Sequence, residues 1–162
     1  MKLAPILWSL AVLAWTTCAQ AGLEITEFSA NSNGSFPDVD GEASDWIELQ
    51  NTGNIPVSTS GYSLTDENDE LSKWPLPAIT LGPGEFLIVF ATGNDRRDPG
   101  QQLHANFSLR ASSGYLALVE PGELTVATEF DYPKQFYGLS YGAGGYFSNP
   151  TPGAPNLSLI HI

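Results

Sequence analysis

The sequence predicts an all-β domain, built as a β-sandwich or a β-barrel. Two observations lead to this prediction. Short segments alternate apolar and polar residues with a period of two, and turns rich in Gly and Pro, such as NTGN, LGPGE and PTPGAP, follow at intervals of about 8–12 residues. After residue 21, no window shows three turns of helical periodicity with capping residues. Many short strands at this spacing are typical of sandwiches and barrels.

The expected strands follow one another along the chain. Three segments show the alternation of half-buried strands: residues 23–28 (LEITEF), 45–51 (DWIELQN) and 61–66 (GYSLTD). The dense apolar run of residues 85–91 (EFLIVFA) predicts a strand that is covered on both faces. Residues 114–120 and 125–132 flank a Pro-Gly-Glu turn, so we expect them to pair as a hairpin.

The N-terminal 21 residues predict a cleavable signal peptide. Lys2 precedes an apolar run over residues 3–15, and the segment closes with the small-x-small triplet that ends at Ala21. The run is too short to span a bilayer comfortably, and the residues before Cys18 do not fit a lipoprotein signal. We therefore expect cleavage after Ala21, a secreted protein in an extracellular or periplasmic setting, and no membrane insertion of the mature chain.

The charge of the mature chain excludes one class of partner. Removal of the signal peptide takes away Lys2 and no acidic residue, which leaves five basic and eighteen acidic side chains and a formal charge of −13. Such a chain repels phosphate backbones, so we expect no binding to nucleic acid. The single cysteine, Cys18, leaves with the signal peptide, and with it any disulfide or thiolate metal ligand.

An acidic stretch is the first candidate for a binding site. It holds five carboxylates: Asp38, Asp40, Glu42, Asp45 and Glu48. Their oxygens suit calcium, but an EF-hand register with Gly41 at the sixth position places Phe36 and Ile47 where carboxylates are required. We favour a polar loop followed by a strand with Trp46 and Ile47 on opposite faces, and a weak calcium site stays open.

The other polar residues predict no catalytic centre. The second acidic run, residues 65–74 (TDENDELSKW), predicts a solvated hairpin loop. His104 is the one histidine in the expected domain, and Ser108 and Ser112 follow it, but the G-x-S-x-G motif of serine hydrolases is absent. We expect His104 to be a surface or packing residue, and we predict no catalytic, cofactor-binding or metal-ligating residue.

Seven aromatic residues raise the alternative of a carbohydrate-binding module, if several are exposed together: Trp46, Trp74, Phe107, Tyr115, Phe130, Tyr137 and Phe147. Aromatic residues on alternating strands more often fill a sandwich core, and we favour that interpretation. The glycine-rich residues 141–150 (YGAGGYFSNP) lack the Lys-Ser/Thr of a phosphate-binding loop and predict a flexible approach to a closing strand.

The last six residues, LSLIHI, form an apolar tail after the proline-rich segment NPTPGAPN. The sequence offers this tail no turn and no strand partner. It resembles the translated remnant of a sequencing adaptor, as found at the ends of some metagenomic reading frames. We therefore expect one domain over residues 22–156, a non-native or disordered tail over residues 157–162, and a native chain that continues past Asn156.

The order of these segments resembles one known family. LEITEFSANSNG, SDWIELQNTGNIPVSTSGYSLTDENDELSKWPLPA, ITLGPGEFLIVFATGND, LHANFSLRASSGYLALVEP and YGAGGYFSNPTPGAPN are similar to the lamin-tail domain, in the form carried by secreted bacterial proteins. The similarity covers residues 23–156. It implies an immunoglobulin-like β-sandwich without general catalytic residues. It also implies a set of scaffold positions: Trp46, Ile47, Leu49, Gly61, Leu64, Pro83, Gly84 and Phe107.

The resemblance implies an interaction module. In nuclear lamins the domain contacts chromatin and proteins, and in secreted bacterial proteins it accompanies nucleases, phosphoesterases, proteases or spore-coat-kinase-like domains. The signal peptide, the negative charge and the lack of a coiled-coil rod argue against chromatin binding here. We expect a secreted, non-enzymatic module that attaches to a protein, a polymer or a cell surface. The alternatives are the N-terminal accessory domain of a truncated extracellular hydrolase or spore-coat-kinase-like enzyme, and the carbohydrate-binding module.

Overall fold

A computed structural model describes residues 22–122, 125–157 and 159–160. All regular secondary structure in this part of the chain is β-strand, which confirms the predicted all-β class. The described residues therefore include no helix that is long and apolar enough to cross a membrane. The predicted signal peptide lies outside the described residues and stays a prediction.

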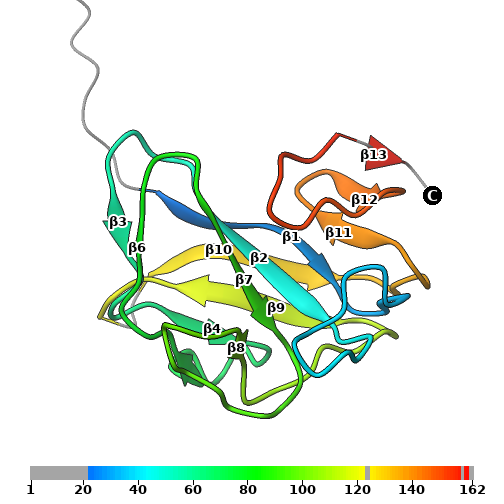
Figure 1. The fold of residues 1–162 in the computed structure, drawn as a ribbon, viewed down its shortest axis with the longest axis horizontal. Helices are drawn as coiled ribbons and strands as arrows, with labels where there is room; N and C mark the ends of the chain where they lie inside the picture. Colours follow the sequence, from blue (N-terminus) through cyan, green and yellow to red (C-terminus); the bar gives the residue numbers. More distant parts are fainter. Residues whose placement is uncertain (1–21, 123–124, 158, 161–162) are drawn as a thin grey trace, which may run out of the picture.

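The described strands form two main sheets and one small pair (Figure 1). The large sheet has the order β13-β12-β11-β1-β2-β7-β8, the second sheet the order β10-β9-β4-β5, and β3 pairs with β6. The strand bounds are β1 (Leu23–Ser29), β2 (Trp46–Asn51), β3 (Val57–Ser58), β4 (Ser63–Thr65), β5 (Trp74–Pro75), β6 (Thr80–Leu81), β7 (Phe86–Phe90), β8 (Leu103–His104), β9 (Gly114–Val119), β10 (Val126–Tyr132), β11 (Ser140–Gly142), β12 (Gly145–Phe147) and β13 (Leu159–Ile160). Neighbouring strands are antiparallel except for β7 and β8.

The hydrophobic core lies between the two main sheets. Strands β1 and β2 of the large sheet contribute Phe28, Ile47 and Leu49, and strands β4 and β9 of the second sheet contribute Leu64 and Leu116; all five are fully buried. Burial of each such side chain contributes roughly 1.5–3 kcal/mol to stability. This packing of two sheets face to face is the predicted sandwich.

The expected strands are found close to their predicted places. Strands β2 and β4 lie within their alternating segments, β1 extends one residue past its own, and β9 and β10 pair in an antiparallel hairpin. The prediction for residues 85–91 is wrong in part, because Val89 and Phe90 are buried whereas the first three residues of β7 are only half-buried. The reason is that β8 pairs with Val89 and Phe90 alone, so the first part of β7 lies at an open sheet edge.

The glycine-rich segment is a tight hairpin, which corrects the expectation of a flexible approach. Strands β11 and β12 pair through Tyr141 with Tyr146 and through Gly142 with Gly145, and β11 continues the large sheet beside β1. A Cβ atom at Gly142 would collide with the carbonyl oxygen of Thr26. Glycine therefore lets β11 approach β1 closely.

The C-terminal residues return to the same end of the large sheet, where Figure 1 shows β11, β12 and β13 together. Leu159 pairs with Phe147 and Ile160 with Tyr146. The expectation that the tail lacks a strand partner is therefore wrong for these two residues. The reason is that β12 otherwise presents a free edge, which two residues of suitable pattern can extend. The non-native origin of the tail stays a prediction.

Candidate functional site

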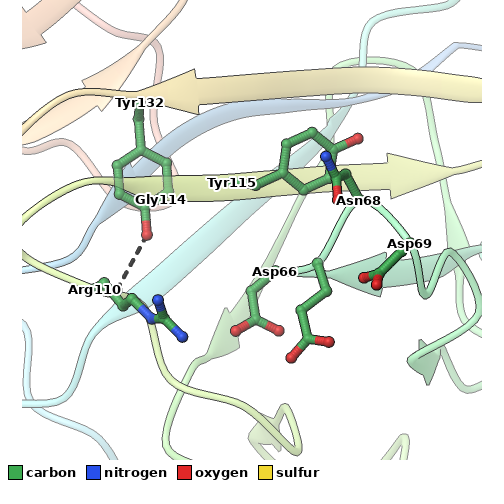
Figure 2. A pocket seen from close by; sticks show the side chains of 8 residues that line it. Asp66, Asn68, Asp69, Arg110, Gly114, Tyr115 and Tyr132 are labelled. Atoms are coloured by element: carbon green, nitrogen blue, oxygen red, sulfur yellow. Dashed lines mark hydrogen bonds between the residues drawn. The ribbon is translucent and has the colours of Figure 1, made fainter.

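A polar cavity of about 270 Å³ opens where the β4–β5 loop faces the start of β9 and the end of β10 (Figure 2). The side chains around it carry carboxylate, amide, guanidinium and phenol groups. Its lining residues are Asp66, Glu67, Asn68, Asp69, Arg110, Gly114, Tyr115 and Tyr132. Its volume lies just below the range of about 300–1,000 Å³ that is usual for small-molecule pockets, so it suits one side chain or one small ring.

The acidic wall of the cavity is the hairpin loop that the sequence predicts between β4 and β5. The two strands pair through Leu64 and Trp74, which fixes the ends of the loop. At its start, the Thr65 hydroxyl donates to the carbonyl oxygen of Glu67 at 2.9 Å and accepts the Glu67 N–H at 3.0 Å. Such a local turn directs the following polar side chains out of the sheet and toward the cavity.

Lys73 neutralises part of this acidic wall. Its Nζ lies 2.7 Å from Asp66 and 2.5 Å from Glu67. The hydrogen bond from Lys73 and its charge lower the pKa of Glu67. Burial opposes the charge of Lys73, but the bonds and charges of the two carboxylates outweigh burial and raise its pKa. Asp69, by contrast, takes part in none of the described ion pairs and stays exposed at the rim.

Arg110 supplies the positive charge on the opposite side. Its side chain is exposed and takes part in none of the described ion pairs, and Figure 2 shows the guanidinium directed toward the side where Asp66 lies. Its backbone N–H donates to the Tyr132 hydroxyl at 3.1 Å, the dashed line in Figure 2. The guanidinium therefore keeps its five N–H donors available to a ligand.

Two tyrosines build the rigid side of the cavity. Tyr132 is buried, which raises its pKa, and a Cβ at Gly114 would lie only 2.5 Å from its hydroxyl oxygen. Glycine at position 114 thus makes room for this ring. Tyr115 is half-buried and donates to Glu129 at 2.9 Å; burial and this bond raise its pKa to about 12. Tyr115 therefore stays neutral at physiological pH.

The five carboxylates of the first acidic stretch do not meet at one point. Asp38 accepts hydrogen bonds from the backbone of Asp40 (2.9 Å) and Glu42 (3.0 Å) and from the Ser44 hydroxyl (2.6 Å). These bonds outweigh the opposing effect of burial and lower the pKa of Asp38. Asp38 is also buried. The polar loop that the sequence predicts is therefore not exposed along its whole length.

The remaining candidate calcium ligands have separate partners. Asp40 pairs with Arg96 at 2.6 Å, and Asp45 accepts the Ser32 N–H at 3.4 Å. Glu48, on β2, is fully buried and bonds the Thr26 hydroxyl and the Gly153 N–H. Within the part of the chain that the structure describes, no three His, Cys, Asp or Glu side chains gather in a group able to hold a metal ion.

His104 is a packing residue, as the sequence predicts. It lies fully buried in β8, stacks on Phe90 with ring centroids 5.4 Å apart, and its Nδ1 lies 3.0 Å from the Thr92 hydroxyl. Burial lowers its pKa, and the charge of Arg96 acts in the same direction. Ser108 and Ser112 make no described contact with the imidazole, so the structure assembles no Ser-His pair here.

The aromatic residues fill the interior, which confirms the favoured interpretation. Of the seven named from the sequence, four are buried, Tyr115 and Phe130 are half-buried, and Tyr137 is 72 % exposed. Sequence reasoning missed Arg110 and the buried state of Glu27 and Glu48. No local pattern identifies Arg110 as a site residue. For Glu27, the alternation of apolar and polar residues breaks after Thr26, and this break could have indicated its unusual position.

The sequence matches the Lamin Tail Domain family over residues 16–133. This range contains strands β1 to β10 and every residue that lines the cavity. No curated protein matches the chain.

Proposed function

Because the chain belongs to the lamin tail domain family, a non-catalytic, immunoglobulin-like family, we propose that it is a secreted binding or tethering module. It attaches to a protein, a polymer or a cell surface, and it does so without catalysing a reaction. The secretion of the chain rests on the sequence pattern of residues 1–21.

One observation carries the proposal: the cavity combines polar side chains that form none of the described ion pairs with a rigid support. Arg110 and Asp69 stand at its rim outside the described ion pairs, whereas Tyr132 and Gly114 belong to paired strands of the sandwich. Loops that carry polar side chains on a rigid scaffold are the usual place for recognition in such domains. We therefore place the contact with the partner at this cavity.

The charge of the chain favours some partners over others. With a formal charge of −13 after removal of the signal peptide, the mature chain attracts basic surfaces and repels polyanions. Arg110 adds a local group that binds carboxylates or sugar hydroxyls. The proposed partner is therefore a basic protein surface or a polymer rich in hydroxyl groups. Nucleic acid is not among the proposed partners.

Retention assays on the mature chain test the proposal. The chain, residues 22–162, is passed over peptidoglycan, cellulose, chitin and an immobilised basic protein such as lysozyme. We expect retention by at least one of the four. Arg110→Ala and Tyr115→Ala should weaken that retention, whereas Lys134→Ala, which also removes one positive charge but lies outside the cavity lining, should not.

Two outcomes decide against the proposal. If none of the four supports retains the wild-type chain, attachment to these partner classes is wrong. If retention occurs but Arg110→Ala and Lys134→Ala bind as well as the wild type, the module binds through another surface. A circular dichroism spectrum of each variant shows whether the sandwich is intact before the comparison is made.

A further inference from the structure

Two carboxylates lie side by side on the outer face of the large sheet. Glu27 of β1 and Glu48 of β2 are paired in register, and the side chains of both are fully buried. Phe28 and Ile47, their neighbours in sequence, belong to the core between the sheets. A β-bulge between Ile25 and Glu27 changes the alternation of β1 and turns Glu27 outward. The burial of this pair therefore depends on what covers the outer face.

The cover is the segment of residues 150–156, which we call the C-terminal strap. The Thr151 N–H donates to both Glu27 oxygens (3.2 and 3.3 Å), and its hydroxyl donates to Oε2 at 3.1 Å. The Gly153 N–H donates to Glu48 Oε2 at 2.6 Å. The Asn156 amide donates to the carbonyl oxygen of Thr26 at 3.1 Å. Two carboxylates thus hold most of the described bonds between the strap and the sheet.

The surroundings of the pair contain no compensating charge among the described residues. The Ser140 hydroxyl of β11 bonds Glu27, and the Thr26 hydroxyl bonds Glu48 at 2.6 Å. The register neighbours on the flanking strands are Gly142 of β11 and Ile88 of β7, and the strap itself reads PTPGAPN. Apart from each other, the two carboxylates therefore face only neutral groups, so their simultaneous ionisation is unfavourable.

We propose that Glu27 and Glu48 form a proton-dependent latch that holds the C-terminal strap on the sandwich. Protonation keeps the strap closed, and ionisation of both carboxylates promotes its opening. A protonated Glu48 keeps both of its bonds, because its carbonyl oxygen accepts from Gly153 while its hydroxyl donates to Thr26. The strap lies outside the matched family range of residues 16–133, and the latch is independent of the binding proposed above.

The direction of the pH effect follows from burial. Burial is the largest influence on both groups and raises their pKa values against the opposing hydrogen bonds; the charge of Glu27 adds to the effect on Glu48, whose pKa rises from 4.5 to about 7. In the opened strap, both groups regain ordinary values. Closure is therefore strongest below pH 4.5, weakens as the pH rises toward 7, and changes little above that value.

Hydrogen exchange on the mature chain tests the latch. The opening constant is measured for the strap amides, Thr151 and Gly153, at several pH values from 4.5 to 8.5, after correction for intrinsic exchange, with the core amide of Leu49 as the internal reference. We expect strap opening to rise roughly a hundredfold between pH 4.5 and pH 7 and then to level off, as a Glu48 pKa raised from 4.5 to about 7 implies. Leu49, which exchanges through global unfolding, should stay far better protected than the strap amides at every pH, because the strap opens without unfolding of the core.

Variants separate the latch from general effects of charge. Glu48→Gln should keep the strap closed and remove most of its pH dependence. Glu24→Gln, an exposed carboxylate on the same strand β1, should keep the wild-type profile. A flat profile in the wild-type chain overturns the proposal, and so does an undiminished pH dependence in a folded Glu48→Gln variant. If that variant fails to fold, the wild-type profile and Glu27→Gln decide in the same way.

Discussion

Trp46 and Ile47 are consecutive residues of β2, and they are buried on opposite faces of the large sheet. Ile47 lies in the core between the sheets, whereas Trp46 packs edge-on against Phe36, with ring centroids 6.2 Å apart. Both side chains are at most 2 % exposed. The loop that carries Phe36 therefore covers the outer face of β2 at this point. This loop leads into the acidic stretch, and it takes part in the packing of the domain.

Replacement of Trp46 by alanine should destabilise the domain strongly. The change removes a fully buried ring and leaves a cavity beside Phe36, which costs about 3–5 kcal/mol in the free energy of unfolding. Urea unfolding followed by circular dichroism measures the loss. A matched change of the exposed Tyr137 to alanine should cost less than about 0.5 kcal/mol. Equal midpoints for the two variants would refute the assignment of Trp46.

Replacement of Gly142 by alanine should also destabilise the domain. A methyl group at this position collides with the carbonyl oxygen of Thr26, so β11 has to move away from β1. We expect a loss of about 1–3 kcal/mol, as for overpacked positions. Gly100→Ala is the control, since its backbone is compatible with alanine and its new Cβ meets only Asp98 at 3.4 Å. If both variants unfold at the same urea concentration, the close approach of β11 is not a constraint.

Calcium should leave the thermal stability unchanged. Asp38 bonds its own loop, Asp40 pairs with Arg96, and Asp45 bonds Ser32, so these carboxylates would have to break existing bonds to share an ion. Melting curves in EGTA and in millimolar CaCl₂ provide the measurement. A bound cation at a hundred times its Kd would add about 2.7 kcal/mol, which is easily detected. A clear rise of Tm in calcium would contradict the separate roles of these side chains.

The stability of the domain should decrease as the pH rises from about 4.5 to about 7. Burial raises the pKa of Asp45 to about 6 and that of Glu48 to about 7, so the folded state binds protons that the unfolded state releases. Burial lowers the pKa of His104 from its ordinary value of 6.5, so this group favours the folded state more as the pH rises toward 6.5. The effect of this one group opposes that of the two carboxylates. Urea midpoints at pH 5 and pH 7.5 should therefore differ in favour of pH 5. A higher midpoint at pH 7.5 would contradict the burial of these carboxylates.

The sequence predicts the fold well because its pattern is local. Alternation in residues 45–51 places Ile47 and Leu49 on one face, and the structure confirms this burial. The limits of the prediction have equally physical causes. A single bulge in β1 turns Glu27 to the outer face, and the pairing of β8 with only two residues of β7 leaves Phe86 half-buried.

The candidate site is much harder to predict from the sequence. Its acidic wall is visible as a hairpin loop, but Arg110 comes from a segment about forty residues further along the chain, and only the pairing of β4 with β9 brings the two together. The buried pair of Glu27 and Glu48 is hard to predict for the same reason, because its contacts join residues that are far apart in the sequence. Thr151 meets Glu27 across more than a hundred residues of sequence, and no periodic pattern encodes such a contact.

The central claim is that this lamin tail domain binds a partner at the cavity around Arg110 and Tyr115. A binding isotherm of the partner retained in the assay above tests it most directly, with wild-type, Arg110→Ala and Lys134→Ala chains compared at one salt concentration. We predict about tenfold weaker binding for Arg110→Ala, which corresponds to about 1.4 kcal/mol, and an unchanged Kd for Lys134→Ala. Identical Kd values for all three chains would contradict the claim.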